Sequence, residues 1–234
     1  MSKFFTCRGG LVQSPDGMLP HSLTVGVRNS LMQQPDLLTR PMTLADIDAV
    51  VRIHQGAFQG FFLTRMGPRF LRSYYRTVLD YAGSVALVVA DSGLGEPLGF
   101  AVGFHEPHRF YALFRQRRLR LLPAMLRAVI MDPSLVFAIL QNMRRIEAER
   151  DRPQLKIVEL SSIGVGKQGA GIGSQLIEAF VAQAVRLGSK QIKLTTDRDN
   201  NDGVRAFYER RGFVLDGLED RGKRSLCRYI RTIG

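Results

Sequence analysis

Residues 156–174, KIVELSSIGVGKQGAGIGS, join an apolar, β-branched run to a glycine-rich turn. The run at 156–165 is typical of a buried strand, and residues 171–187 then repeat apolar side chains at helical spacing. Glycines at alternate positions let the backbone adopt positive φ angles and approach a ligand closely. Because the turn opens a helix, its free N–H groups and the helix dipole favour a bound anion. We therefore interpret the turn as a pyrophosphate cradle built by Gln168, Gly169, Ala170, Gly171, Ile172, Gly173 and Ser174.

The glycine-rich turn differs from two other phosphate-binding motifs. No Gly-Lys-Ser/Thr sequence follows it, which excludes a P-loop. Its glycine spacing is also not the G-x-G-x-x-G of a dinucleotide site, which opens a parallel βαβ unit. A plain tight turn before a helix is the alternative explanation of the glycines alone.

A second motif lies one predicted strand after the cradle. It consists of Asn201, Phe207, Tyr208, Gly212 and Phe213. Each residue also has a purely structural explanation. Asn201 can cap the helix expected at 202–211, Phe207 suits the buried face of that helix, and Gly212 suits the left-handed turn that ends it. The combination is more specific than its parts, because it follows the cradle by a single strand.

The two motifs together resemble those of the GCN5-related N-acetyltransferase (GNAT) superfamily. The cradle of that family has the pattern Gln/Arg-x-x-Gly-x-Gly/Ala, which Gln168, Gly171 and Gly173 match. Its downstream pattern, an Asn, an aromatic–Tyr pair and Gly-Phe, corresponds to the second motif. The resemblance covers residues 38–234 and is strongest at 156–213. It implies an α/β (α+β) fold, in which a mixed, mostly antiparallel and splayed sheet is flanked by helices and acyl-CoA lies in the gap.

The resemblance also implies an activity. A GNAT enzyme moves an acetyl group from acetyl-CoA to a primary amine by direct attack in a ternary complex, and no metal is expected. The further cofactor contacts that it implies are Ile163, Gly164, Val165, Asn201 and Phe207. Tyr208 corresponds to the acid that protonates the departing thiolate, with packing in the core as the alternative. Simple helix capping is the alternative for Asn201.

One spacing departs from the family pattern. In many relatives a longer loop separates the last strand residue from the Gln of the cradle, whereas only Gly166 and Lys167 separate Val165 from Gln168. The usual spacing returns if the strand ends at Ile163. The residues that bind the pantetheine arm therefore depend on where the strand ends.

The attacking amine must lose a proton, and Glu159 is the predicted general base. It lies between Val158 and Leu160 on the predicted central strand, and apolar surroundings raise the pKa of a carboxyl group. A carboxylate that pairs with an Arg, or one that faces away from the cleft, is the alternative. The rival bases are His54, His105 and His108. Backbone N–H groups of the splayed strand suffice to stabilise the tetrahedral oxyanion.

Charge and composition limit the partners and the compartment. The 234 residues include 33 Lys and Arg against 21 Asp and Glu, a formal net charge of +12. Such a charge attracts nucleic acid, anionic membrane surfaces or phosphate-bearing small molecules, and it repels a polycationic acceptor. Cys7 and Cys227 form neither a disulfide framework nor a C-x-x-C motif. No segment resembles a signal peptide or an apolar membrane span of about 20 residues, so a cytoplasmic location is expected.

The domain organisation is predicted from composition and periodicity. Residues 1–37, rich in Gly, Pro, Ser and Gln, are expected to form a flexible leader before an acetyltransferase domain at 38–234. The elements expected around the two motifs are helices at 43–57 and 68–81, an apolar loop at 61–63, and strands at 84–91, 97–105, 191–196, 213–215 and 226–230. A basic helical insert is predicted at 109–152, where all ten cationic side chains are Arg. It can pack on the core, touch a membrane surface or line the acceptor site.

The acceptor is the least defined part of the prediction. The region before the strands and the long insert also resemble, more loosely, acetyltransferases of bacterial surface-polysaccharide and sugar-nucleotide gene neighbourhoods, which implies a small-molecule acceptor such as an amino sugar. The alternative acceptors are a protein N-terminus, a lysine, a polyamine or an aminoglycoside amine. A non-catalytic acyl-CoA-binding sensor of the same fold is the alternative. A basic nucleic-acid-binding module is less favoured, because the chain carries no recognised nucleic-acid motif. A homodimer is compatible with the sequence.

Overall fold

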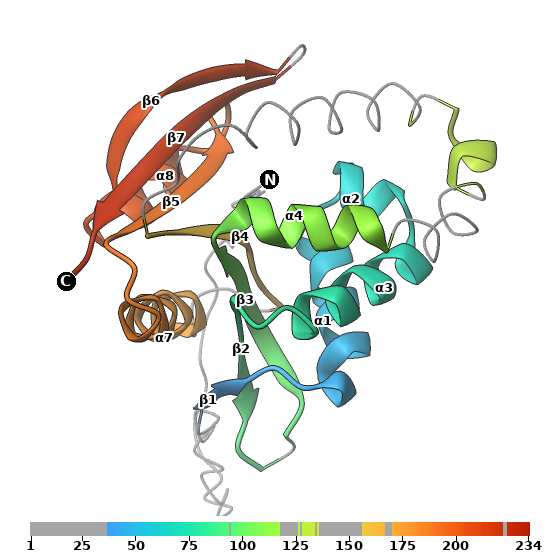
Figure 1. Ribbon diagram of the computed structural model, residues 1–234, viewed down its shortest axis with the longest axis horizontal. Coiled ribbons are helices and arrows are strands. Elements are labelled where there is room, and N and C mark those ends of the chain that lie inside the picture. The colour runs from blue at the N-terminus through green and yellow to red at the C-terminus, as the bar shows by residue number, and fades with distance from the viewer. Residues whose placement is uncertain are drawn as a thin grey trace, which may run out of the picture.

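The computed structural model describes residues 37–93, 95–117, 126, 128–133, 135, 156–166, 170–221 and 224–234. The strands are β1 (Leu37–Pro41), β2 (Ser84–Asp91), β3 (Pro97–His105), β4 (Ile157–Val165), β5 (Gln191–Asp197), β6 (Val214–Arg221) and β7 (Arg224–Thr232). They form one sheet in the order β1-β2-β3-β4-β5-β7-β6, and every pair is antiparallel except β4–β5 (Figure 1). The predicted α/β fold with a mixed, mostly antiparallel sheet is therefore confirmed.

Helices cover both faces of the sheet. They are α1 (Ile47–Ala57), α2 (Phe62–Arg65), α3 (Pro68–Leu79), α4 (Pro107–Gln116), α7 (Ile172–Arg186) and α8 (Asp202–Glu209). Helix α7 packs on β2, β3 and β4 from one side, and α1 and α3 lie on the other side (Figure 1). Two apolar clusters result, one under α7 and α8 and one under α1, α3 and α4.

A capping interaction stabilises the start of the first helical segment. The backbone N–H and the hydroxyl of Thr43 donate to Oδ2 of Asp46 at 2.7 and 2.9 Å. Arg40 of β1 forms an ion pair with the same carboxylate at 2.7 Å. Because Asp46 is buried, these donors compensate for the loss of its hydration. The contact also fixes β1 against the helical layer.

Four elements differ from the sequence prediction. Part of the expected apolar loop at 61–63 is a helical turn, α2, and Gly67, at φ +86°, then turns the chain into α3. Strand β1 was not predicted, because its five residues lack an alternating pattern and become a strand only by pairing with β2. Strands β6 and β7 are longer than expected, since ladder hydrogen bonds extend them through polar residues near the hairpin.

The predicted leader and the predicted insert fall largely outside the described residues. Strand β1 begins at Leu37, where the leader was expected to end. Of the insert, the structure describes the part of α4 from Arg109 onward, Arg117, and residues 126, 128–133 and 135. The helical prediction for residues 109–116 is confirmed by α4.

The sheet splays between its two central strands. Strand β4 pairs with β5 only from Ile157 to Glu159, which face Gln191 to Lys193. Beyond Glu159, β4 continues to Val165 paired with β3 alone. The splay predicted from the family resemblance is therefore present, and it begins immediately after Glu159.

A bulge interrupts β4 at the same point. Val102 of β3 faces Ser162, whereas the next residue, Gly103, faces Leu160. Ser161 is therefore the extra residue of the bulge, and a bulge re-aims the neighbouring side chains and backbone groups. The bulge and the start of the splay coincide.

Candidate active site

The cradle lies at the N-terminus of α7. Gly171 is the N-cap residue at φ +72°, a conformation that L side chains rarely adopt, and the N–H of Ser174 donates to its carbonyl at 2.9 Å. Ala170 and Gly171, directly before α7, are exposed, whereas Ile172 in its first turn is buried. The predicted residues Gln168 and Gly169 lie outside the described residues. Strand β4 ends at Val165, so the shorter of the two spacings before Gln168 applies.

The two sequence motifs meet at Gly173. A Cβ atom at this position would lie 3.3 Å from Cζ of Phe207, so the absence of a side chain lets α8 approach the first turn of α7. Phe207, predicted as a cofactor contact, therefore lies beside the predicted cradle. The close approach explains in physical terms why both motifs occur together.

Arg211 also reaches the cradle, although the sequence analysis did not select it. Its guanidinium lies over the ring of Phe207, 3.7 Å from the centroid. One nitrogen donates to the carbonyl of Phe207 at 3.0 Å and the other to the hydroxyl of Ser174. No sequence signal marks this residue, because the GNAT pattern specifies Tyr208 and Gly212 on either side of it.

Tyr208 and Asn201 are both buried. The ring of Tyr208 is fully enclosed, with centroids 5.4 Å from Phe213 and 6.3 Å from Tyr229. Asn201 occupies the N-cap position of α8 without a side-chain capping bond. Its amide nitrogen instead donates to Thr196 Oγ1 at 2.8 Å and to the carbonyl of Asp197 at 2.9 Å. Asn201 thus ties α8 to the end of β5, on the far side of the splay.

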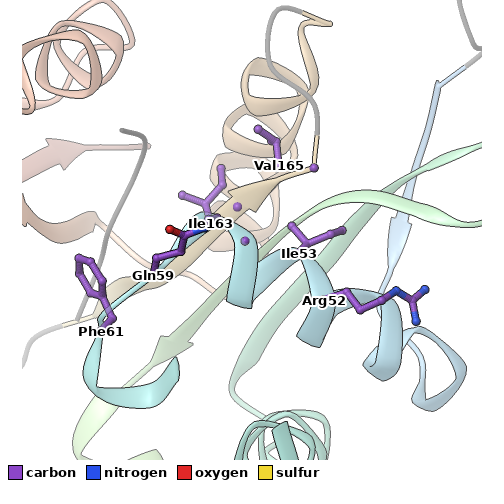
Figure 2. A pocket seen from close by; sticks show the side chains of 10 residues that line it. Arg52, Ile53, Gln59, Phe61, Ile163 and Val165 are labelled. Carbon is purple, nitrogen blue, oxygen red and sulfur yellow. The ribbon is translucent and has the colours of Figure 1, made fainter. Parts of the chain in front are cut away.

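A cavity of about 530 Å³ lies between α1 and the splayed end of β4. Its lining residues are Arg52, Ile53, Gly56, Ala57, Gln59, Phe61, Ile163, Gly164, Val165 and Gly166. The predicted pantetheine contacts Ile163, Gly164 and Val165 therefore form one wall, and Figure 2 shows Phe61 and Arg52 at opposite ends of the view. A Cβ atom at Gly164 would lie 3.0 Å from the ring of Phe100 on β3 and 3.4 Å from Cβ of Ala57 in α1, so this part of β4 packs tightly against both β3 and α1.

One end of the cavity is bridged across the splay. The guanidinium of Arg224, at the start of β7, lies 4.8 Å from the ring centroid of Phe61. The same guanidinium donates from Nε to Oδ1 of Asp197 at 3.1 Å. The segment between α1 and α2 is thereby linked to the β5–β7 half of the sheet.

Glu159 lies on the face of β4 that α4 covers. Its side chain is buried, and the hydroxyl of Tyr111 donates to its Oε1 at 3.1 Å. Val158 and Leu160 point to the opposite apolar cluster, as successive strand residues must. Glu159 is thus buried, but its apolar neighbours in sequence do not surround the carboxylate. The hydroxyl of Tyr111 contacts it instead, and Glu159 is not among the cavity-lining residues.

A row of buried hydroxyl groups accompanies Glu159 on this face. The hydroxyls of Tyr74 and Ser161 lie 3.4 Å apart, and burial raises the pKa of Tyr74, with a further increase from the charge of Glu159. Tyr75 shares a hydrogen bond of 2.7 Å with Nδ1 of His54. Tyr74 and Tyr75 lie within the helix predicted at 68–81, but their polar contacts could not be predicted, because their partners Ser161 and His54 are distant in sequence.

The three rival bases are spread over the structure. His54 is buried in α1, and burial lowers its pKa to about 3, so this histidine is neutral at pH 7. His105 ends β3 and lies 2.9 Å from the hydroxyl of Ser189, measured from Nδ1. His108 belongs to the first turn of α4. The structure does not bring these three side chains to one site.

The family comparison bears on the region that holds both motifs. The Acetyltransferase (GNAT) family matches residues 145–213, which contain β4, the cradle, α7, β5 and α8. The match covers less than half of the chain, and it supports the GNAT superfamily and an acetyltransferase activity for this region. The comparison with curated proteins gives no match.

Solved GNAT structures share the fold of this chain. An N-acetyltransferase from Staphylococcus aureus Mu50 gives a TM-score of 0.55 at 15% identity, over 85% of this chain and 99% of that one. The ribosomal-protein-S18-alanine N-acetyltransferase from Escherichia coli gives a TM-score of 0.53 at 14% identity, over 85% of this chain and 94% of that one. The NatC complex bound to Gag peptide and CoA contains a chain that gives a TM-score of 0.55 at 13% identity, over 85% of this chain and 99% of that one. At these identities the similarity concerns the fold alone.

The described part of the chain contains neither a membrane-spanning helix nor a metal-binding cluster. No helix there is long and apolar enough to cross a membrane. No group of three or more His, Cys, Asp or Glu side chains there could hold a metal ion.

Proposed function

We propose that this GNAT protein transfers an acetyl group from acetyl-CoA to a primary amine of a small-molecule acceptor, by direct attack in a ternary complex. One observation carries the proposal. A single strand, β4, passes from buried Glu159 through the bulge and along the cavity wall to the cradle that opens α7. A predicted base, a cavity and an anion site therefore lie along one strand.

The described residues fit acetyl-CoA in two respects. Beyond Glu159, the edge of β4 that faces β5 has no strand partner among the described residues, so its backbone groups can pair with the amides of an extended pantetheine arm. A Cβ atom at Gly171 would have no described atom within 4 Å, which leaves room for a phosphate group at the helix N-terminus. Ile163, Gly164, Val165 and the residues 170–174 would hold the cofactor.

The proposed proton transfers use two buried groups. When bound, acetyl-CoA supplies the thioester that the amine attacks. Glu159 accepts the ammonium proton, and the hydrogen bond from Tyr111 orients its carboxylate. Because Glu159 does not line the cavity, the proposal requires a relay that carries the proton from the amine to its carboxylate. Tyr208 donates a proton to the leaving thiolate.

Backbone groups at the bulge are proposed to stabilise the oxyanion. Ser161 is left out of the regular β3–β4 ladder, at the point where β5 diverges. A fixed N–H group there can donate to the negative charge that develops on the carbonyl oxygen. This role needs no side chain.

The cavity limits the acceptor class. Its ten lining residues include one charged side chain, Arg52, and no carboxylate. A polyamine or aminoglycoside would find no counter-charge among these residues, and the net charge of +12 also repels it. We therefore favour a small acceptor with one amine, and an amino sugar is such a compound.

The decisive experiment is an acceptor screen in which released CoA is detected through its thiol. Wild-type protein, acetyl-CoA and a panel of amino sugars, amino acids, polyamines and peptides are incubated at pH 7.5, and calorimetry measures acetyl-CoA binding separately. We expect binding, and CoA release only with one acceptor class. Binding without release across the panel would favour the sensor function, and absence of binding would refute the proposal.

A further inference from the structure

Arg211 is held against the first turn of α7 by three contacts. It follows α8, and its guanidinium turns back over the ring of Phe207 at 3.7 Å. Hydrogen bonds to the carbonyl of Phe207 and to the hydroxyl of Ser174 fix the plane of the guanidinium. Ser174 lies three residues after Gly171, within the first turn of α7. A guanidinium has five N–H donors, so these two bonds leave donors for a ligand.

The charge of Arg211 is poorly compensated where it lies. The N-terminus of a helix carries partial positive charge, so a cation there is repelled and an anion is attracted. Burial lowers the pKa of this half-buried Arg, Arg210 lowers it further, and Glu178 acts in the opposite direction. Among the described residues, Arg211 forms no ion pair with any carboxylate. Two positive groups therefore face the same space, and a bound anion would stabilise both.

We infer that Arg211 is a phosphate-binding residue of the cofactor site, acting together with the cradle at the start of α7. The inference rests on the proposed function, because coenzyme A supplies the phosphate groups. Its pyrophosphate and its 3′-phosphate offer the same chemistry to a guanidinium, namely charge-assisted and often bidentate hydrogen bonds. Phe207 and Ser174 fix the orientation of the Arg211 guanidinium before the phosphate binds, which lowers the entropy lost on binding.

The test compares Arg211→Gln with Arg210→Gln. Arg210 is the exposed neighbour, and both changes remove one positive charge from adjacent positions. Calorimetry on the full chain measures Kd for CoA and for 3′-dephospho-CoA. We expect Arg211→Gln to weaken CoA binding about 10- to 100-fold, whereas Arg210→Gln changes it less than about threefold. The Kd of Arg211→Lys should lie between those of wild type and Arg211→Gln, because lysine keeps the positive charge but lacks the planar guanidinium.

The second ligand and the salt dependence identify the phosphate. An equal loss for CoA and 3′-dephospho-CoA assigns Arg211 to the pyrophosphate, and a loss confined to CoA assigns it to the 3′-phosphate. In either case the dependence of log Kd on salt should become shallower in Arg211→Gln, which a purely structural role would not produce.

Two negative outcomes distinguish a failure of this inference from a failure of the proposed function. In the first, wild-type protein binds CoA, and Arg211→Gln is folded by circular dichroism and binds CoA as well as Arg210→Gln does. That result would overturn this inference but not the proposed function. Wild-type protein that binds no CoA would remove the proposed function, and this inference with it.

Discussion

The hydroxyl of Tyr111 donates a hydrogen bond of 3.1 Å to Oε1 of Glu159 and so joins α4 to the central strand β4. The bond crosses 48 residues of sequence, and both side chains are largely shielded from water. It lies next to the point where β4 and β5 separate. A carboxylate that is buried, oriented and adjacent to the opening of the sheet is well placed to accept a proton.

Glu159→Gln tests the proposed base. The amide keeps the shape of the side chain but cannot accept the ammonium proton, so kcat should fall about 100- to 10,000-fold at pH 7 with little change in the Kd of acetyl-CoA. Tyr111→Phe is the matched variant, because it removes only the orienting hydrogen bond; we expect a loss of about tenfold or less. Steady-state kinetics over pH 6–9 provide the measurement. Wild-type activity in Glu159→Gln would exclude this residue as the base.

Tyr208→Phe tests the proposed acid. Because the ring is fully buried, the substitution preserves packing, and kcat should fall about 100-fold while acetyl-CoA affinity stays within about twofold. Tyr229→Phe is the control from the same core; its hydroxyl donates to Glu209 at 2.6 Å. Equal effects of the two variants on kcat and Tm would mean that Tyr208 has only a structural role.

Substitutions at Gly171 should separate stability from cofactor binding. Gly171→Ala places a side chain at φ +72°, which costs about 1–2 kcal/mol, without a clash among the described atoms. Gly171→Asp suits the N-cap position better and should be no less stable than the alanine variant. Its charge, however, repels phosphate, so acetyl-CoA binding should weaken at least about 100-fold more than in Gly171→Ala. Thermal denaturation and calorimetry measure the two effects, and equal affinities would place the phosphate elsewhere.

His54 should make the fold sensitive to acid. Burial lowers its pKa to about 3, against 6.5 in the unfolded chain, so below pH 6.5 only the unfolded state binds a proton at this residue. Its contribution to the free energy of unfolding is complete above pH 6.5 and falls by about 1.4 kcal/mol per pH unit as the pH drops towards 3.

His54→Gln is the corresponding variant, and urea denaturation at pH 7.5 and pH 5 is the measurement. The loss of stability between the two pH values should be smaller in His54→Gln than in wild type. Tyr75→Phe removes the hydrogen-bond partner of His54 but keeps the imidazole, so its pH dependence should remain. An unchanged pH dependence in His54→Gln would show that other groups dominate acid unfolding.

Local patterns predicted the elements but not all of their boundaries. The strands at 84–91 and 97–105 are where the apolar runs placed them, because β-branched residues and flanking turn residues act over a few positions. The same patterns could not predict β1, whose pairing partner Asp91 is 54 residues away from Leu37. A strand that depends on a distant partner leaves little trace in its own sequence.

The sequence by itself determined the resemblance to the GNAT motifs, the start of α7 at the cradle and the helix that carries Tyr208, since glycine conformation, apolar periodicity and motif spacing are properties of short segments. Tertiary structure alone decided which face of β4 Glu159 occupies, that Tyr111 is its partner, and that Arg211 reaches Ser174 across 37 residues. These relationships depend on how helices cross the sheet and on where the bulge at Ser161 shifts the strand. Such contacts are set by the packing of distant segments, and no local pattern of residues encodes them.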